Sequence, residues 1–400
     1  MSTHSVQMAA PPDLERCPIM SNFAAPSVMF VRGEGARLWD NHGKRYLDFL
    51  CGLAVTSLGH AHPEVADAIA EQARTLLHVS SIFATEHAWH VARTIDHLIG
   101  DGAPAGGQVF FCNSGAEANE AAIKLARKWA GHGRYGVVTT YGSFHGRTLA
   151  TLAATGQPAK HEPFAPMPEG FRHVALNDIA ALEAAIDPSV AAILLEPIQG
   201  EGGVNPATTE YLQAARRLCD ERGLLLMMDE VQTGFARTGR WFGFQHHGVV
   251  PDVVCLAKAM GNGMPIGALW ARADVAAAFQ PGDHGSTYSG QPMATSAARK
   301  VLEIKQRDDL PARATERGAV LAAKLREIPQ VVEVRGSGLI LAAELAPGLD
   351  AKAVYAACLE AGLVVNAITA SALRLTPPLT VTEAEIDEAV AILAGVLRTS

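Results

Sequence analysis

The sequence predicts an α/β protein with a mostly parallel sheet covered by helices and a second, smaller α+β domain. Short apolar runs of strand length alternate with longer amphipathic stretches through the middle of the chain, which is typical of parallel sheets. This alternation stops after about residue 305. We therefore expect a large domain over residues 51–304 and a small domain formed by residues 1–50 together with residues 305–400.

Six apolar runs carry the strand prediction. Each is too short for a helix, and each is continuously apolar, as expected for strands that are buried on both faces of a parallel sheet. In chain order they are QVFFC (108–112), GVVTT (136–140), VAAILLE (190–196), LLLMMD (224–229), VVCL (253–256) and IGALWA (266–271).

Helical patterns lie between most of these runs, the clearest at residues 116–130 and 210–223. The small domain is predicted from three further elements. They are a long helix over residues 311–328, a strand pair around residues 331–345, and a final helix that begins at Glu383.

Composition and charge exclude several classes of protein. The 400 residues carry a net charge of −8 and only 18% are charged, so no basic footprint for nucleic acid or an anionic membrane is present. The start of the chain lacks a basic segment followed by an apolar one, and no apolar run reaches the ~18 residues that span a bilayer. We expect a cytoplasmic globular protein with no nucleic-acid or membrane partner.

The cysteines and histidines give no sign of a metal site. Six cysteines are scattered along the chain without C-x-x-C spacing, which predicts reduced and mostly buried thiols rather than disulfides or a zinc site. His60 and His62 have no acidic residue or cysteine at ligand spacing beside them. We therefore expect no bound metal.

Lys258 lies just after the run VVCL and before a loop with three glycines, in VVCLAKAMGNGMPIGA. In open α/β sheets the carboxyl ends of the strands line the ligand crevice. A desolvated lysine there has a lowered pKa and can act as a nucleophile. A solvated lysine at the start of a loop is the alternative, and this stretch alone leaves both interpretations open.

The stretch FFCNSGAEANEAA (110–122) predicts a helix N-terminus on the same crevice. Ser114 precedes the helical pattern and Glu117 lies three residues later, which is the spacing of a capping box. Such a terminus presents free N–H groups and a partial positive charge, which suit a phosphate. An ordinary capped helix is the alternative, although its position after a strand favours the anion site.

Asp229 closes the run LLLMMD. A carboxylate at a buried strand end needs a partner, whether a helix cap, a basic side chain or a ligand nitrogen. The cofactor that combines a lysine imine, a phosphate and an acid is pyridoxal 5′-phosphate (PLP), because its pyridine nitrogen must stay protonated to act as an electron sink. A purely structural role for Asp229 is the alternative.

Six stretches resemble the signature blocks of the class III (ω-amino acid) aminotransferases, in order and at the spacing of that family. They are NSGAEANEAAIKLAR, YGSFHGRT, EPIQGEGG, DEVQTGFARTG, LAKAMGNGMPIGA and HGSTYSG. The segments RGEGARLWDNHGKRYLDFLCGLAVTSLGHAHPEV and LRLTPPLTVTEAEID match as well, so the resemblance covers nearly the whole chain. It implies a PLP-dependent aminotransferase of fold type I, with a seven-stranded, mostly parallel sheet in the large domain.

The resemblance implies a role for each matching residue at the cofactor. Lys258 would form the covalent bond with PLP and, once the substrate displaces it, shuttle the proton. Asp229 would hold the pyridine nitrogen and Gln232 would lie near the phenolic oxygen. The phosphate donors and the residues on the two faces of the ring would be Ser114, Gly115, Ala116, Phe144 and Val231.

In this family a threonine of the neighbouring subunit completes the phosphate site. The matching residue is Thr287 in GSTY, which implies a homodimer with shared sites. The resemblance also places Ser286, beside it, among the substrate-binding residues.

Two carboxylate sites are implied for the substrates. Arg147 in FHGRT would bind one carboxylate, because a guanidinium group holds a carboxylate through two hydrogen bonds. Arg374 in LRLTPP and Glu201 in QGEGG would form the second site and its gate. The alternatives are a surface arginine at residue 147 and a structural ion pair between residues 201 and 374.

The implied reaction transfers an ω-amino group to 2-oxoglutarate, and N-acetylornithine is the expected donor. Ornithine, succinylornithine, succinyldiaminopimelate and 4-aminobutyrate stay open as donors, as does a glutamate-semialdehyde-type aminomutase. A cofactor-binding protein without turnover is disfavoured because it has no need of Lys258, Asp229 and Arg147 together. A dehydrogenase is disfavoured because no G-x-G-x-x-G follows an early strand.

Several residues depart from the pattern of the family, and we expect them near the acyl end of the substrate pocket and its mouth. They are Phe23, Ser81, Phe83, Ser289 and Gln291. None lies in the stretches that carry the imine chemistry, so they bear on the choice of donor.

Overall fold

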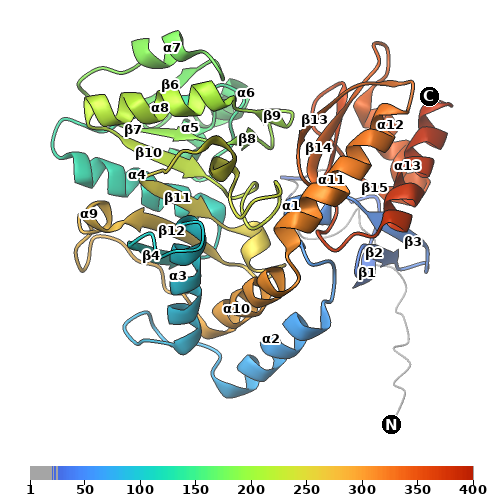
Figure 1. The fold of residues 1–400 in the computed structure, drawn as a ribbon, viewed down its shortest axis with the longest axis horizontal. Helices are drawn as coiled ribbons and strands as arrows, with labels where there is room; N and C mark the ends of the chain where they lie inside the picture. Colours follow the sequence, from blue (N-terminus) through green and yellow to red (C-terminus); the bar gives the residue numbers. More distant parts are fainter. Residues whose placement is uncertain (1–19, 21, 24–25, 400) are drawn as a thin grey trace.

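A seven-stranded sheet forms the centre of the computed structural model, which describes residue 20, residues 22–23 and residues 26–399 (Figure 1). The strand order is β4-β12-β11-β10-β7-β5-β6. The strands are β4 (Gly107–Cys112), β5 (Gly136–Thr140), β6 (Phe171–Val174), β7 (Val190–Leu195), β10 (Leu225–Asp229), β11 (Val253–Leu256) and β12 (Gly267–Arg272).

All six predicted apolar runs are strands of this sheet, and the seven strands implied by the resemblance are confirmed. The strand without a predicted counterpart is β6, which lies at the sheet edge and has only Val174 fully buried. Its sequence FRHV contains two polar residues, because an edge strand does not need the continuous apolar pattern of a central strand.

The sheet is parallel except for β12, which runs antiparallel to both of its neighbours. The carboxyl ends of β10 and β11 therefore lie at the same edge, and Asp229 is the last residue of β10. Because β12 reverses direction, residues 257–266 connect β11 to β12 across this edge without a crossover. Lys258 lies in that connection.

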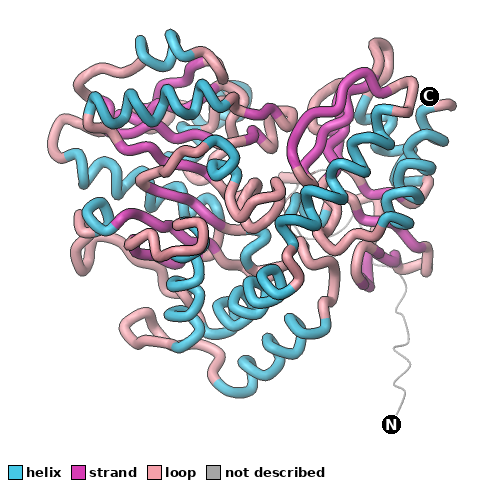
Figure 2. Tube along the Cα trace, in the orientation of Figure 1, coloured by secondary structure: helices cyan, strands magenta, loops and turns pink. Residues whose placement is uncertain are grey.

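Side chains on the two faces of the sheet form two separate cores. Along β11, Val254 and Leu256 pack in one core, whereas Val253 and Cys255 pack in the other, as the two-residue period of a strand requires. Helices cover both faces (Figure 2). They are α2 (Pro63–Thr75), α3 (Glu86–Ile99), α4 (Gly115–Ala130), α5 (Leu149–Ala154), α6 (Pro158–His161), α7 (Ile179–Ala184), α8 (Thr209–Arg222), α9 (Ala273–Ala276) and α10 (Pro292–Arg307).

Two four-stranded sheets make up the other half of the molecule, in the orders β1-β2-β3-β15 and β13-β14-β17-β16. Because β15 pairs in parallel with β3, strands from the two ends of the chain share one sheet. The strands are β1 (Phe30–Glu34), β2 (Arg37–Asp40), β3 (Arg45–Asp48), β13 (Val331–Ser337), β14 (Ile340–Leu345), β15 (Leu363–Val364), β16 (Asn366–Ala367) and β17 (Ala372–Leu375).

Three helices complete this half, and they confirm the predicted helical segments. The long helix predicted after residue 305 is α11, and the final helix begins at Glu383 as predicted. A capping box between Thr382 and Glu385 fixes that start, since each side chain accepts a backbone N–H of the other residue. The helices are α11 (Leu310–Arg326), α12 (Ala351–Glu360) and α13 (Glu383–Leu397).

Helix α10 joins the two halves of the molecule. Val301 and Ile304 pack in the core of the terminal sheets, whereas Ala298 and Leu302 pack against the central sheet. The boundary predicted at residues 304 and 305 therefore falls inside a continuous helix. The division into two domains stays a prediction, which the separate sheets support.

The segment α1 (Cys51–Ala54) is a left-handed turn between the two halves. Four consecutive residues, Cys51 to Ala54, have φ between 52° and 67°, and three of them are not glycine. Such a backbone costs about 1–2 kcal/mol per non-glycine residue. Hydrogen bonds from the nitrogen of Thr376 to Phe49 and from its hydroxyl to Leu50 hold the residues before the turn.

The cysteines, possible metal sites and possible membrane spans can be compared with the predictions for the described residues. Five cysteines are free and buried, while Cys17 lies outside the described residues. Within that part of the chain no group of three or more histidine, cysteine and acidic side chains could hold a metal. The described helices include none that is long and apolar enough to cross a membrane.

Candidate active site

A cavity of about 230 Å³ opens at the carboxyl edge of the central sheet. Segments from five parts of the chain contribute to it: the start of α4, the loop after β5, the end of β7 and the loops after β10 and β11. Its lining residues are Gly115, Ala116, Asn119, Phe144, His145, Gly146, Arg147, Glu196, Glu201, Asp229, Val231, Gln232 and Lys258.

Lys258 lies in this cavity, as its position after a buried strand predicted. Its backbone adopts φ +44°, a left-handed conformation that a non-glycine residue keeps only where its surroundings enforce it. Burial lowers the pKa of the Lys258 amine below its ordinary value, and the Arg374 guanidinium lowers it further, while Glu201 and Asp229 raise it. The amine is therefore more easily deprotonated than a surface lysine.

Asp229 is buried and accepts three hydrogen bonds. Its Oδ2 accepts from Asn119 Nδ2 and His145 Nδ1, both at 2.8 Å, and its Oδ1 accepts from the backbone nitrogen of Val231 at 3.1 Å. These donors stabilise a charged carboxylate in a buried position. Asp229 and Lys258 face the same cavity from adjacent strands, so the structure brings the predicted acid and the predicted nucleophile together.

The N-terminus of α4 also opens on this cavity through Gly115 and Ala116. Ser114 caps the helix, since its Oγ accepts from the backbone nitrogen of Glu117 at 3.2 Å. The capping box predicted here is only half formed. The Glu117 carboxylate accepts from the backbone and side-chain nitrogens of Asn113 instead of the nitrogen of Ser114.

Arg374 is fully buried and pairs with Glu201, with 2.5 Å between Nη1 and Oε1. The same Nη1 donates to the carbonyl oxygen of Gly200 at 2.9 Å and to Gln232 Oε1 at 3.0 Å. Burial raises the pKa of the Glu201 carboxyl, but the charges of Arg374 and Lys258 lower it more, so the net direction is downward. The predicted gate and its arginine are therefore in contact, and Gln232 belongs to the same network.

Arg147 differs from Arg374 in having no acidic partner in the part of the chain that the structure describes. It is exposed at the mouth of the cavity, and its guanidinium carbon lies 5.5 Å from the centre of the Phe144 ring. An unpaired guanidinium at this place is free to bind a carboxylate through two hydrogen bonds.

Thr287 and Ser286 do not line this cavity. Thr287 is exposed, and the hydroxyl of Ser286 accepts from Asn113 Nδ2 at 3.0 Å, which holds the segment near the start of α4. The roles predicted for both residues are therefore not fulfilled within a single chain.

Three residues of the site were not predicted from the sequence: Asn119, His145 and Glu196. Asn119 and His145 hold Asp229, and each keeps one buried polar atom without a protein partner in the described residues, Asn119 Oδ1 and His145 Nε2. Glu196 accepts from the backbone nitrogens of Phe144 and Gly200. The signal that could have found Asn119 is its polar side chain on the alanine-rich, buried face of α4.

Burial strongly raises the pKa of the Glu196 carboxyl, and the negative charge of Asp229 raises it further. Two carboxylates on one cavity thus have different environments, since Asp229 accepts from two side chains whereas Glu196 accepts only from the backbone. Glu196 therefore favours its protonated form.

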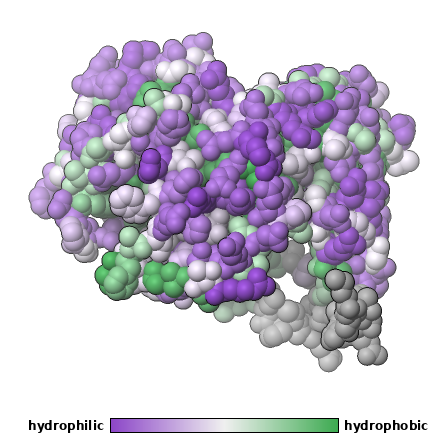
Figure 3. All heavy atoms as spheres, turned by 60° about the horizontal axis from the view of Figure 1, so that its bottom comes forward, coloured by the Kyte–Doolittle hydropathy of each residue, from purple (hydrophilic) through white to green (hydrophobic). Residues whose placement is uncertain are grey.

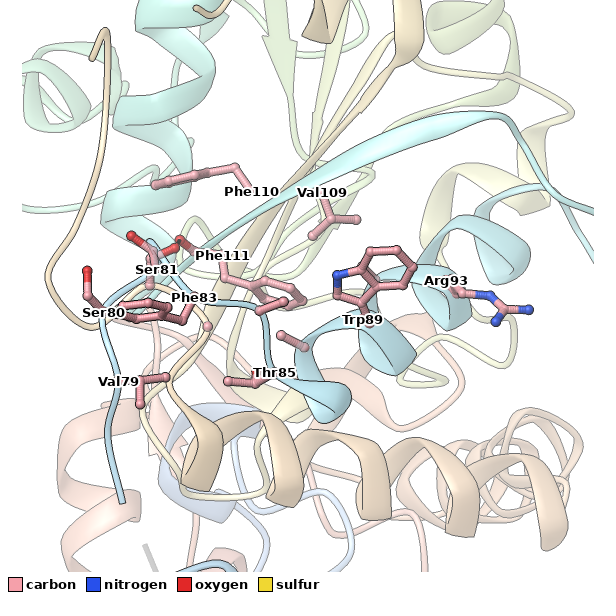
Figure 4. Close-up of a pocket in the computed structure, with 15 residues that line it drawn as sticks. Val79, Ser80, Ser81, Phe83, Thr85, Trp89, Arg93, Val109, Phe110 and Phe111 are labelled. Carbon is pink, nitrogen blue, oxygen red and sulfur yellow. Dashed lines mark hydrogen bonds between the residues drawn. The ribbon is translucent and has the colours of Figure 1, made fainter. Parts of the chain in front are cut away.

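Three of the departing residues line a second cavity, of about 390 Å³, on the outside of β4. They are Ser81, Phe83 and Ser289, and they share it with Trp89 and Phe111 (Figure 4). None of the three lines the cavity that holds Lys258 in a single chain, so their place at the acyl end of the substrate pocket and its mouth stays a prediction. Phe23 is exposed, and the Gln291 side chain caps α10.

The model of the family "Aminotransferase class-III" matches residues 20–397. The chain belongs to the class III aminotransferases. It is 47% identical to an acetylornithine aminotransferase of Caldanaerobacter subterraneus subsp. tengcongensis, over 95% of this chain and 97% of that protein. It is 48% identical to an acetylornithine aminotransferase of Gloeobacter violaceus, over 94% of this chain and 95% of that protein.

A solved structure of similar fold is that of an ornithine aminotransferase from Toxoplasma gondii, with PLP at its active site. Its TM-score is 0.90 at 34% identity, and the match covers 96% of this chain and 92% of that one. The fold type I assignment and the prediction of an aminotransferase are confirmed.

PLP is the cofactor of this family, and the site of this aminotransferase fits it. The observations that carry the fit are an amine with lowered pKa, a buried carboxylate held by three donors, and a helix N-terminus, all on one cavity. Lys258 would bind the aldehyde carbon, Asp229 the pyridine nitrogen and the start of α4 the phosphate. When bound, PLP supplies an electron sink for the carbon that loses its proton.

Proposed function

We propose that this aminotransferase transfers the δ-amino group of N-acetylornithine to 2-oxoglutarate, as a cytoplasmic homodimer. The single observation on which the proposal rests is the different surroundings of two arginines: Arg147 is unpaired at the mouth of the cavity, whereas Arg374 is buried and pairs with Glu201, which lines the cavity. The names of the two relatives that are nearly half identical in sequence support the choice of donor.

The unlike arginines suit two substrates of opposite orientation. N-acetylornithine must present its distal amine to the reacting position, so its only carboxylate lies far from that position, near Arg147. Its reacting carbon bears no carboxylate, and Arg374 then needs Glu201 as its partner, because an unpaired buried charge is costly. Glutamate reacts through its α-amine, so its α-carboxylate requires Arg374 and Glu201 must move aside.

The proposed proton transfers use Lys258. Its uncharged amine would take the proton from the substrate carbon and hold it for return, which requires an amine that loses its charge easily. Burial meets this requirement by lowering the pKa of Lys258. Asn119 and His145 hold the Asp229 carboxylate in place, and Asp229 would bind the pyridine nitrogen.

An apolar surface beside the Thr287 segment supports the proposed homodimer. Leu77, Ile82, Phe83, Trp89 and Tyr288 are each more than half exposed. Large exposed apolar side chains that lie together mark interaction surfaces in soluble proteins. Figure 3 brings this side of the molecule forward, and apolar residues gather along its lower edge.

Two observations place the segments around residues 78–83 and 288–289 side by side on this surface. The rings of His78 and Tyr288 lie 5.3 Å apart, and Ser289 and Phe83 line the same cavity. A second subunit docked here would cover the apolar side chains. It would also receive the Thr287 segment, which supports a shared phosphate site.

The test is a panel of amino donors with purified protein and 2-oxoglutarate, with glutamate formation as the readout. N-acetylornithine is expected to react fastest, ahead of ornithine, succinylornithine, succinyldiaminopimelate and 4-aminobutyrate. A preference for one of these four would replace the proposed donor and leave the reaction type in place. Conversion of glutamate semialdehyde without any acceptor would instead indicate the aminomutase.

A further inference from the structure

Lys305 is a buried lysine that the reaction described above does not use. It lies near the end of α10 and its side chain is fully buried. No acidic side chain pairs with it among the described residues. Its Nζ donates instead to two backbone carbonyl oxygens, that of Ala259 at 2.9 Å and that of Phe235 at 3.0 Å.

These two carbonyl groups belong to the two loops that carry the chemistry. Ala259 directly follows Lys258, and Phe235 lies in the loop that follows Asp229 and includes Gln232. Lys305 is therefore a bridge between the nucleophile loop and the carboxylate loop, behind the cavity.

Both loops are strained at or next to the residues that Lys305 holds, at Phe235 itself and at Lys258 just before Ala259. Lys258 has φ +44° and Phe235 has φ +57°, and neither is glycine. Such conformations persist only where surrounding contacts enforce them. A second donor acts on the same loop, because the hydroxyl of Ser57 also donates to the carbonyl oxygen of Ala259, at 3.3 Å.

The chemistry of a buried amine suits this task. Burial lowers the pKa of the Lys305 amine well below its ordinary value, and the nearby Arg237 lowers it further. An uncharged amine has two N–H donors, and the structure offers two carbonyl acceptors. Both N–H groups of the uncharged Lys305 amine can therefore donate to a carbonyl oxygen, and no unpaired charge is buried.

We propose that Lys305 is a positioning residue for transamination. It fixes the distance between the Lys258 amine and the Asp229 carboxylate by tying the two loops together at Ala259 and Phe235. The proposal rests on the roles given to Lys258 and Asp229 under the proposed function. Loss of the bridge should affect bond formation at Lys258 more than non-covalent binding of the cofactor.

The experiment compares two cofactor forms on apoprotein of wild type and of Lys305→Met. PLP reports covalent bonding to Lys258, followed by absorbance and checked by borohydride reduction and peptide mapping. Pyridoxamine 5′-phosphate has no aldehyde and reports non-covalent binding alone. The matched control is Lys300→Met on the same helix, since Lys300 pairs with Glu303 in a partly exposed position.

We expect the covalent step in Lys305→Met to slow about tenfold, the effect of losing two hydrogen bonds of modest strength. Binding of pyridoxamine 5′-phosphate should change much less, and Lys300→Met should match wild type in both measurements. Equal losses in both measurements would indicate a merely structural role and overturn the proposal, as would a covalent step at the wild-type rate.

Ser57→Ala provides a second test should Lys305→Met not fold. It removes the other donor to Ala259 and leaves Phe235 unaffected, so the same selective slowing is expected in milder form, and an unchanged covalent step would contradict the proposal. Wild-type protein that forms no adduct on Lys258 would contradict the proposed function instead.

Discussion

The Glu201 carboxylate has to satisfy two opposite demands at one arginine. It neutralises the fully buried guanidinium of Arg374, whose Nε has no partner in the described residues, and it must also leave when a substrate carboxylate arrives. Its side chain is about a quarter exposed (27%), so it has a path toward solvent. The remaining partners of Arg374 are the carbonyl oxygen of Gly200 and the side chains of Gln232 and Asn366, which keep the guanidinium in place.

Glu201→Ala should change the balance of the two half-reactions. Glutamate no longer has to displace a carboxylate, so its half-reaction should become faster, whereas N-acetylornithine leaves Arg374 buried and unpaired and should react more slowly. We expect the ratio of the two rates to shift by about 1–3 kcal/mol, or roughly 5- to 150-fold. Single-turnover absorbance measurements with each donor give this ratio. An unchanged ratio would leave Glu201 as a structural ion-pair partner.

The lowered pKa of Lys258 predicts a specific pH dependence of cofactor binding. The reactive form is the uncharged amine, so the rate at which apoprotein bonds to PLP should rise with pH and level off below pH 10.5, the ordinary lysine value. Because the Glu201 charge raises this pKa, Glu201→Gln should move the plateau to lower pH. Rates divided by those of Nα-acetyllysine, the latter first corrected for the uncharged fraction of its amine, remove the titration of PLP itself. A rate that still climbs at pH 10.5 contradicts this prediction.

At the scale of elements, the start of α4 fits closely against the loop after β10. A Cβ atom on Gly115 would lie 2.7 Å from Cγ1 of Val231 and 2.9 Å from its Cγ2, closer than atoms of a side chain can approach. The glycine thus lets the N-terminus of α4 and the Val231 side chain share one wall of the cavity. The need for glycine here arises from proximity, because its φ is not in the left-handed region.

Gly115→Ala should weaken PLP binding by forcing Val231 out of position. Overpacking of this kind costs about 1–3 kcal/mol, so we expect an affinity loss of roughly tenfold or more. Gly395→Ala is the matched control, because its Cβ has open space and lies in α13, away from the cavity. Equilibrium titration of apoprotein with PLP measures both. Similar affinities for the two variants would mean that Val231 yields without cost.

The central sheet and the two main site residues could be predicted because their signals are local. Buried parallel strands are continuous apolar runs, and Lys258 and Asp229 each follow such a run directly or within two residues. β6 lacks that signal because it is an edge strand. The half-formed capping box at Ser114 was also not predicted in full. The spacing of the motif does not distinguish the backbone nitrogen of Ser114 from that of Asn113, which binds the Glu117 carboxylate.

The remaining site residues could not be predicted because their partners are distant in sequence. Asn119 and His145 meet Asp229 from two other segments, and no spacing within either segment reveals that contact. Lys305 was missed for another reason, since a lysine in a helical pattern is ordinarily exposed. The second cavity that Ser81, Phe83 and Ser289 line could not be predicted either, because it depends on how the segments before α3 and α10 fold.

For the whole molecule, the segment that contains Ser286, Thr287 and Ser289 couples the site to the proposed subunit interface. Ser289 is held within its own chain, where its hydroxyl donates to the carbonyl oxygen of Phe111 at 2.6 Å. Thr287, two residues earlier, is exposed beside the apolar surface. The hydroxyl of Ser289 is hydrogen-bonded within its own chain, whereas Thr287 is exposed. Thr287→Ala and Ser289→Ala are therefore a matched pair of variants.

Thr287→Ala should lower PLP affinity about tenfold, because a hydrogen bond to a charged phosphate contributes about 1.5–3 kcal/mol. By linkage, PLP should stabilise the wild-type dimer more than the dimer of this variant. Ser289→Ala should not lower PLP affinity. PLP titration and analytical ultracentrifugation with and without PLP measure the two effects. A tight PLP-bound monomer at low concentration would refute the shared site.

The pairing of β3 with β15 also affects the order in which the two halves of the molecule can fold during synthesis. A ribosome releases the chain from its N-terminus, and domains generally fold as they emerge. All seven strands of the central sheet precede residue 273, so Asp229 and Lys258 can reach their edge while synthesis continues. β3 must wait for residues 363–364, and the carbonyl groups of Phe49 and Leu50 must wait for Thr376. A nascent chain therefore gains its reactive lysine before it gains Arg374.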